Sequence, residues 1–194
     1  MSRKALTSLA VFGVELLANP DQVGAAVPSS RALARRLAAC IPSQPPGYVV
    51  ELGAGTGAVT QALLDHGVPA ERLIPVELSR PMVRHLRERF PQLNVLAGDA
   101  SQLSRLLFRH LELAPGSVSH IVSSLPLRSL PKEVVQRIAA EISFVLPPTG
   151  RFVQYTYDLR RETHDALTDF ARARTSIVWF NLPPARVDVF HPRV

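Results

Sequence analysis

From about residue 48 onward, the chain alternates short apolar runs with stretches whose apolar residues recur at helical spacing. The apolar runs predict buried strands at 48–52, 73–77, 94–97, 118–123 and 151–157. Between them the spacing predicts helices at about 58–66, 81–90, 103–111 and 131–145. Regular alternation of strands and helices is typical of an α/β fold with a parallel sheet.

The C-terminal part has a different pattern. A further helix is predicted through residues 162–173, followed by two β-rich runs at 176–180 and 186–190. Only residues 181–185 separate these runs, which leaves no room for a helix. We therefore expect an antiparallel hairpin on the sheet edge and a seven-stranded, mostly parallel sheet with an antiparallel last strand.

The N-terminal part, residues 1–46, reads as a helical extension ahead of a domain at 47–194. Ser29 or Ser30 offers a cap for a helix at about 31–41, and a proline-rich linker follows. Before it, residues 5–18 are apolar around most of a helix, follow two basic residues and are too short to span a bilayer, which takes roughly 20 residues. Glu15 and the lack of a cleavage site argue against a signal peptide. Two interpretations stay open: a membrane-docking lid or a helix packed on the domain's core.

Composition narrows the class of protein. A length of 194 residues with 46% hydrophobic content supports one substantial core. The net charge of +6 favours an anionic partner, either nucleic acid or an acidic membrane surface, although a surplus of arginine can equally reflect surface solvation. The single cysteine, Cys40, excludes an internal disulfide and a metal site built on several thiolates, which fits a reducing cytosol and predicts no metal.

Candidate chemistry centres on the segment from Glu51 to Gly57, where an acid at a strand end precedes three glycines in alternate positions. Glycine lets the backbone turn tightly and approach a ligand, while the next helix presents its N-terminal N–H groups. The spacing is G-x-G-x-G, which departs from the G-x-G-x-x-G of pyrophosphate binders. The loop therefore predicts a different nucleoside cofactor.

Two further acids stand at the ends of the next strands. Glu77 ends the second strand, where a carboxylate can accept protons from both ribose hydroxyls. Asp99 follows the third strand, where a carboxylate can accept from an adenine amino group. Each acid alone would more often be a helix cap or a surface charge, but together with the glycine turn they indicate an adenosine site.

These motifs resemble those of class I S-adenosylmethionine-dependent methyltransferases with a Rossmann-like fold. Residues 19–34 and the segment Ser123 to Leu127 resemble more narrowly the bacterial phospholipid N-methyltransferases, which are related to ribosomal RNA adenine dimethylases. By this resemblance, Glu51 holds the methionine amino group directly or through water, Glu77 the ribose and Asp99 the adenine. The resemblance implies cofactor contacts from Glu51, Gly53, Ala54, Gly55, Thr56, Gly57, Glu77, Leu78, Asp99, Ala100 and Ser123.

The acceptor segment distinguishes lipid from nucleic acid as the substrate. Adenine N6-methyltransferases usually carry Asn or Asp, then Leu/Pro-Pro, then an aromatic residue at this place. In this chain Ser124 occupies the position of the Asn or Asp, and Leu125 and Pro126 follow it. Leu127 occupies the position of the aromatic residue that stacks on the base. Stacking contributes roughly 1–3 kcal/mol per base, so nucleobase recognition is disfavoured and nucleic acid is not the expected partner.

The resemblance therefore implies N-methylation of phosphatidylethanolamine toward phosphatidylcholine, by direct attack of the neutral amine on the sulfonium methyl. S-adenosylhomocysteine is the product, and the enzyme would act at the inner face of the cell membrane from the cytoplasm. The candidate proton acceptors are Glu15, Asp158 or water. Catalytic contacts are assigned to Ser124, Leu125, Pro126 and Tyr157, and substrate contacts to Arg31, Tyr155 and Arg186, with Arg35 a further phosphate partner.

Tyr155 and Tyr157 are expected to point to opposite faces of the sheet, and Tyr157 is favoured to offer a π face to a methylated ammonium. The alternative activity is adenine N6-methylation of ribosomal RNA. Such enzymes usually add a C-terminal helical domain, whereas this sequence stops at Val194. A non-catalytic membrane or nucleotide sensor is disfavoured by the intact glycine turn and both acids.

Overall fold

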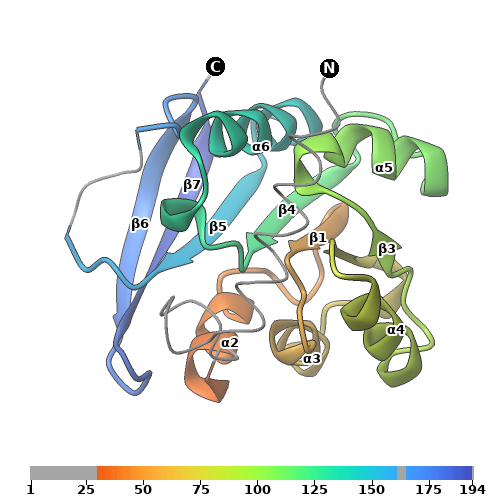
Figure 1. Cartoon of the computed structure of the whole chain (residues 1–194), viewed down its shortest axis with the longest axis horizontal. Coiled ribbons are helices and arrows are strands. Elements are labelled where there is room, and N and C mark those ends of the chain that lie inside the picture. The colour runs from red at the N-terminus through yellow and green to blue at the C-terminus, as the bar shows by residue number, and fades with distance from the viewer. Residues whose placement is uncertain (1–29, 161–164, 194) are drawn as a thin grey trace.

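The structure is a computed structural model that describes residues 30–160 and 165–193. Seven strands form one sheet in the order β3-β2-β1-β4-β5-β7-β6 (Figure 1). The strands are β1 (Tyr48–Leu52), β2 (Leu73–Glu77), β3 (Leu96–Ala97), β4 (Val118–Ser123), β5 (Arg151–Thr156), β6 (Phe170–Val178) and β7 (Ala185–Pro192). β1 to β5 pair in parallel, whereas β7 runs antiparallel between β5 and β6. The predicted Rossmann-like fold with an antiparallel last strand is confirmed.

Helices cover both faces of the sheet (Figure 1). On one face lie α2 (Arg31–Ala38), α3 (Ala58–Asp65) and α4 (Arg80–Arg89), and on the other lie α5 (Leu103–Leu111) and α6 (Lys132–Val145). Each face buries its own hydrophobic cluster, one with Leu33, Leu37 and Leu63, the other with Ile138 and Phe152. Because helices cover both faces, every residue of β2 and β4 is buried, including the polar residues Glu77 and His120.

The N-terminal helix α2 is part of the domain's core. Ser30 caps it as predicted, because its side-chain oxygen accepts a hydrogen bond from the backbone N–H of Leu33. Its buried residues Leu33 and Leu37 belong to the same cluster as the α3 residue Leu63. The apolar segment 5–18 and Glu15 lie outside the described residues.

The prediction of a helix through residues 162–173 is wrong for residues 165–173, the part of this range that the structure describes. Residues 170–178 form β6, which pairs along β7 from Phe170 opposite Pro192 to Val178 opposite Ala185. The run Ala171-Arg172-Ala173-Arg174 favours a helix locally, but the long antiparallel pairing and the burial of Phe170 outweigh that propensity. Other differences are shifts of boundaries by up to three residues: α2 ends at Ala38 instead of about residue 41, and the third strand covers 96–97 instead of 94–97.

Strand direction defines one functional edge of the sheet. β6 and β5 are both antiparallel to β7, so β6 runs parallel to β5. The carboxyl ends of β1, β2, β4, β5 and β6 therefore meet at the same edge, where ligands bind in open α/β sheets. Within the ranges that the structure describes, no helix is long and apolar enough to cross a membrane.

Candidate active site

The glycine loop between β1 and α3 presents open backbone at the carboxyl edge. Gly55 has φ of +54°, and a Cβ added there would have no neighbour closer than the Gly53 carbonyl oxygen at 4.0 Å. Gly57 has φ of +82°, but a Cβ added there would lie 2.5 Å from Cε2 of Phe90. Gly57 is therefore required by packing, whereas Gly55 leaves space that a ligand can enter.

Glu77 holds the glycine loop in place. Its Oε2 accepts the backbone N–H of Gly55 at 2.8 Å, and its Oε1 accepts the backbone N–H of Ser79 at 2.8 Å. Each carboxylate oxygen has a second lone pair. The side chain thus orients the loop and keeps acceptor capacity for a ligand's hydroxyl groups.

Glu51 is the most strongly perturbed acid of the site. It is fully buried, and its Oε2 accepts a hydrogen bond of 2.6 Å from Oγ1 of Thr60 on the first turn of α3. The pKa of Glu51 is raised to about 8, mainly by burial and to a smaller extent by the nearby charge of Glu77, while the hydrogen bond from Thr60 opposes the rise. Its Oε1 is buried with no hydrogen-bond partner among the described residues, so this oxygen is available to a donor that the chain itself does not supply.

Asp99 lies beside Glu77 at the end of β3. The backbone N–H of the preceding Gly98 donates to the Glu77 carbonyl oxygen at 2.9 Å. Asp99 Oδ1 accepts the backbone N–H of Ser101 at 2.8 Å and caps a short 3₁₀ turn (Ala100–Gln102). Ala100 is buried in the hydrophobic cluster under α5 and α6. Glu51, Glu77 and Asp99 therefore follow one another along three neighbouring strands.

The acceptor segment after β4 is bonded to the end of β1. The backbone N–H of Ser124 donates to the Leu52 carbonyl oxygen at 2.8 Å, and Ser123 Oγ accepts the N–H of Leu125 at 3.2 Å. A Cβ added at Gly53 would lie 2.8 Å from Cδ2 of Leu125, so the glycine loop and the acceptor segment touch. Ser124 Oγ is buried without a hydrogen-bond partner in the described part of the chain.

Leu127 completes this segment, and it points into the core. Its side chain is buried in the cluster that contains the α6 residues. Leu127 is aliphatic and almost fully buried, so it offers no aromatic ring on which a planar base could stack.

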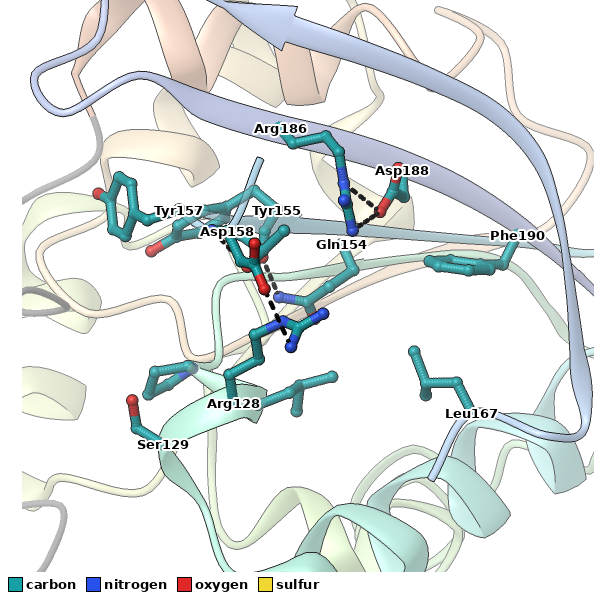
Figure 2. Close-up of a pocket in the computed structure, with 13 residues that line it drawn as sticks. Arg128, Ser129, Gln154, Tyr155, Tyr157, Asp158, Leu167, Arg186, Asp188 and Phe190 are labelled. Atoms are coloured by element: carbon teal, nitrogen blue, oxygen red, sulfur yellow. Dashed lines mark hydrogen bonds and ion pairs between the residues drawn. The ribbon is translucent and has the colours of Figure 1, made fainter. Parts of the chain in front are cut away.

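A cavity of about 250 Å³ opens next to the acceptor segment (Figure 2). It is lined by Pro126, Leu127, Arg128, Ser129, Gln154, Tyr155, Thr156, Tyr157, Asp158, Leu167, Arg186, Asp188 and Phe190. Gln154 Nε2 donates to the carbonyl oxygens of Leu125 at 3.0 Å and Tyr155 at 2.6 Å. Its Oε1 is buried and has no hydrogen-bond partner among the residues described. The lining of the cavity thus includes a residue whose buried amide oxygen no described donor satisfies.

Asp158 contributes a negative charge at the cavity. The Arg160 side chain and backbone N–H bond to it, and Arg128 Nη1 lies 3.1 Å from its Oδ2. Hydrogen bonds from Arg160, with the charge of Arg128, lower the pKa of Asp158 to about 2. A carboxyl group with so low a pKa stays ionised at neutral pH, and its carboxylate is a poor proton acceptor.

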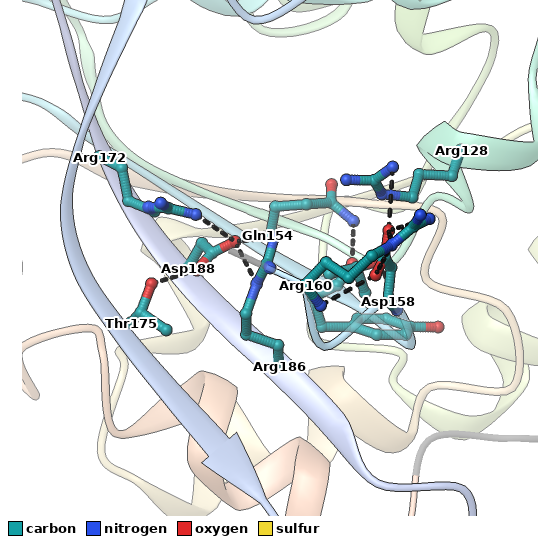
Figure 3. A network of polar contacts seen from close by, with 10 residues as sticks. Arg128, Gln154, Asp158, Arg160, Arg172, Thr175, Arg186 and Asp188 are labelled. Carbon is teal, nitrogen blue, oxygen red and sulfur yellow. Dashed lines mark hydrogen bonds and ion pairs between the residues drawn. The ribbon is translucent and has the colours of Figure 1, made fainter. Parts of the chain in front are cut away.

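The opposite wall of the cavity is a buried ion-pair network on the β6–β7 hairpin (Figure 3). Arg186 Nη2 lies 2.9 Å from Asp188 Oδ2, and both side chains are almost inaccessible to solvent. Arg172 Nη1 lies 3.9 Å from the same oxygen, while the hydroxyl of Thr175 donates to Asp188 Oδ1. The network fixes Arg186 in the wall of the cavity.

Comparisons with known proteins now identify the chain. The family described as a methyltransferase domain matches residues 49–150. An ornithine lipid N-methyltransferase from Singulisphaera acidiphila is 37% identical over 138 residues, which cover 69% of this chain and 70% of the relative. The chain belongs to the methyltransferase domain family. It is a class I S-adenosylmethionine-dependent methyltransferase.

Other relatives share the fold or a part of the sequence. A ribosomal RNA small subunit methyltransferase A from Parasynechococcus marenigrum is 33% identical over 61% of this chain, which spans only 38% of that protein's length. Among solved structures, one is a Burkholderia thailandensis 1,6-didemethyltoxoflavin-N1-methyltransferase with bound S-adenosylhomocysteine, which has a TM-score of 0.69 at 15% identity. The match covers 100% of this chain and 92% of the Burkholderia chain. At 15% identity, this structural similarity shows a shared fold and nothing about the substrate.

The residues of the methyltransferase fit its cofactor. Glu51 keeps a buried oxygen that no donor within 30–160 or 165–193 satisfies, which suits a methionine ammonium group, and the loop leaves open space at Gly55. Glu77 and Asp99 are expected to hold the ribose and the adenine, as the sequence predicts. Ala54, Thr56 and Gly57 lie in the same loop, Leu78 and Ala100 follow the two acids, and Ser123 ends β4.

The predicted substrate residues are not all gathered in one place. Tyr155, Tyr157 and Arg186 line the cavity, whereas Arg31 and Arg35 lie on the exposed surface of α2 and do not contribute to it. The expectation that the two tyrosines point to opposite faces is wrong. Their rings form a T-shaped pair with centroids 5.6 Å apart, because residues two apart in a strand share a face.

Sequence reasoning missed several residues that the structure brings to the site: Thr60, Arg128, Gln154 and Asp188. A signal existed for Gln154, which is a lone amide within the otherwise apolar strand end Phe152 to Tyr155. Thr60 stands nine positions after Glu51, and only the strand–turn–helix geometry brings the two together. Among the residues described, no three His, Cys, Asp or Glu side chains cluster as metal ligands.

Proposed function

We propose that this methyltransferase N-methylates the amine of a membrane lipid whose headgroup also carries an anionic group. The supporting observation is the cavity beside the acceptor segment, whose lining includes the ionised Asp158 and Gln154, a residue whose buried Oε1 has no hydrogen-bond partner in the described ranges. These groups suit an ammonium, while Arg128 and Arg186 in the same cavity suit a phosphate or carboxylate. The similarity to an ornithine lipid N-methyltransferase supports the same class of acceptor.

Two acceptors share this chemistry. Phosphatidylethanolamine, converted toward phosphatidylcholine, is the acceptor implied by the resemblance of the sequence motifs, and it pairs an amine with a phosphate. A lipid of the ornithine type is the acceptor named for the relative, and it pairs an amine with a carboxylate. Either headgroup suits a site that offers acceptors for N–H together with guanidinium groups.

When bound, S-adenosylmethionine supplies a methyl group that an amine can take directly, so the chain needs no covalent intermediate. The role of the chain is to hold and orient the headgroup in the cavity next to the acceptor segment, which contacts the glycine loop through Leu125. Gln154 Oε1 accepts from the amine, and Asp158 provides its counter-charge. Because the Asp158 carboxylate is so weakly basic, water or Glu15 remains as the proton acceptor.

The experiment is methyl transfer from radiolabelled cofactor to separate pools of phosphatidylethanolamine, an ornithine-type lipid, phosphatidylglycerol and ribosomal RNA. We expect label in one or both amine lipids and none in phosphatidylglycerol, which has no amine. Gln154→Leu should lower kcat/KM for the amine lipid by roughly tenfold or more, since it removes a hydrogen bond to a charged group. Its affinity for S-adenosylhomocysteine should be unchanged, which checks folding. Label in RNA alone would overturn the proposal in favour of adenine methylation.

A further inference from the structure

The β6–β7 tip, defined as residues 179–183, exposes three large apolar side chains. Trp179 is 67% exposed, Phe180 94% and Leu182 89%. Asn181 is buried, and its Nδ2 donates to the Pro183 carbonyl oxygen at 2.6 Å, which braces the turn from within. A braced turn with its apolar side chains outward is costly in water unless it meets an apolar partner.

The tip projects from the edge of the sheet that carries the active site. β6 runs parallel to β5, so its last residue, Val178, lies at the carboxyl edge and pairs with Ala185. The next residue, Arg186, is opposite Thr156 and lines the cavity. Whatever the tip contacts is therefore brought close to the acceptor cavity.

Basic side chains on α2 and β6 lie on the side of the hairpin that α2 contacts. Arg36 on α2 donates from Nε to Ser176 Oγ of β6 at 2.8 Å, so α2 lies beside the hairpin, as Figure 1 shows. Arg31 and Arg35 on α2 and Arg174 on β6 are exposed. Residues 30–40 and 170–187 contain no Asp or Glu. An apolar tip with arginine side chains beside it complements a bilayer that contains anionic lipids.

The exposed area favours a bilayer over a second protein. Aromatic side chains bury about 150–250 Å² each, so the three side chains of the tip offer on the order of 500 Å². A stable protein–protein interface takes about 800 Å² from each partner. Insertion into a lipid interface needs only a few such side chains, and tryptophan favours this depth.

We propose that the β6–β7 tip inserts into the interfacial layer of an anionic bilayer and thereby brings the cavity to the lipid headgroups. This inference rests on the proposed lipid acceptor. It adds a membrane contact distinct from the N-terminal segment 5–18, at a site more than 150 residues further along the chain.

Trp179 is the only tryptophan of the chain, so its fluorescence reports on the tip without any substitution. The full chain is mixed with vesicles of phosphatidylcholine and phosphatidylglycerol in equal parts. We expect a blue shift of the emission and quenching by lipids brominated along the acyl chains. Vesicles of phosphatidylcholine alone should give a weaker effect, because they lack the anionic charge.

Sedimentation with the same vesicles then tests the side chains. The double variant Phe180→Asp/Leu182→Asp should bind at least about tenfold more weakly than the wild type, since two apolar side chains become charged. The matched control is Phe108→Asp/Phe144→Asp, which changes two exposed phenylalanines on α5 and α6, at 66% and 61% exposure, and should bind as the wild type does. All four positions are exposed, so folding should survive in both variants.

Unchanged Trp179 emission, or equal losses of binding in the two double variants, would overturn the inference. A self-association that Phe180→Asp/Leu182→Asp abolishes, seen by analytical ultracentrifugation without lipid, would assign the tip to a second copy and also overturn it. Methylation of detergent-solubilised amine lipid separates the two proposals. If that lipid is methylated but the tip does not insert, only the membrane contact fails; if the tip inserts but no amine lipid is methylated, only the proposed acceptor fails.

Discussion

Replacing Glu51 with glutamine should stabilise the free enzyme while impairing its cofactor site. The folded chain holds the pKa of Glu51 at about 8, against an ordinary 4.5, chiefly because the carboxyl group is fully buried. Between these two pH values the folded state binds more protons than the unfolded state, so the free energy of unfolding of the wild type falls as pH rises. Glutamine does not titrate and can still accept the hydrogen bond from Thr60.

The expected magnitude follows from the size of the shift. At 1.36 kcal/mol per pKa unit, a rise from 4.5 to about 8 corresponds to an upper bound of about 5 kcal/mol. The advantage of Glu51→Gln over the wild type should therefore be small near pH 4.5, grow with pH, and level off above about pH 8. Affinity for S-adenosylhomocysteine should fall roughly tenfold or more, because a charge-assisted bond is lost.

Urea unfolding of both proteins without cofactor, from about pH 5 to about pH 9, measures the first effect, and calorimetric titration measures the second. Asp65→Asn serves as control, since it neutralises an exposed carboxylate on α3 and should show no such pH-dependent gain. If the free energies of unfolding of Glu51→Gln and the wild type run parallel across this range, burial does not govern the ionisation of Glu51. If the variant binds S-adenosylhomocysteine normally, the residue does not hold the cofactor.

Three further substitutions test separate parts of the site. Gly55→Val should abolish S-adenosylhomocysteine binding in a titration yet leave a folded protein, and normal binding by a folded Gly55→Val protein would contradict the loop's role. Gly57→Val should instead lower the free energy of unfolding by about 3 kcal/mol or more, because its side chain meets Phe90. Asp188→Asn should cost about 3–5 kcal/mol in urea unfolding, since it breaks the buried ion pair with Arg186, and a loss below about 1 kcal/mol would argue against that network. Asp158→Asn should raise KM for the lipid amine without changing the shape of the pH–rate profile, because the carboxylate is already ionised; loss of the acidic limb would instead make it the base.

The strand–helix alternation from Tyr48 to Val145 was predictable because these elements are buried on a regular period. The hairpin at the C-terminus was also predictable, from two β-rich runs with a short connection. The extent of β6 was not, because Ala171 to Arg174 favours a helix locally and only pairing with β7 makes it a strand. Local helix propensity therefore gives the wrong structure where pairing with another strand determines the conformation.

The candidate site divides in the same way. Glu51, Glu77 and Asp99 were predictable because each follows a strand, and parallel strands bring their ends to one edge. Gln154 and Asp188 were not, since their roles depend on which strands become neighbours in the order β4-β5-β7. The contact between Tyr155 and Tyr157 follows from the strand period alone, and the opposite expectation misapplied that period.

The contact between Gly53 and Leu125 has a consequence for exchanging acceptor segments among methyltransferases. The missing Cβ of Gly53 makes the room that Leu125 occupies, since a Cβ there would lie 2.8 Å from the leucine's Cδ2. A segment grafted after β4 with a small residue in place of Leu125 would leave a void under the glycine loop, and one with a larger residue would push the loop toward the solvent. Redesign of the methyl acceptor therefore has to treat positions 53 and 125 as a pair.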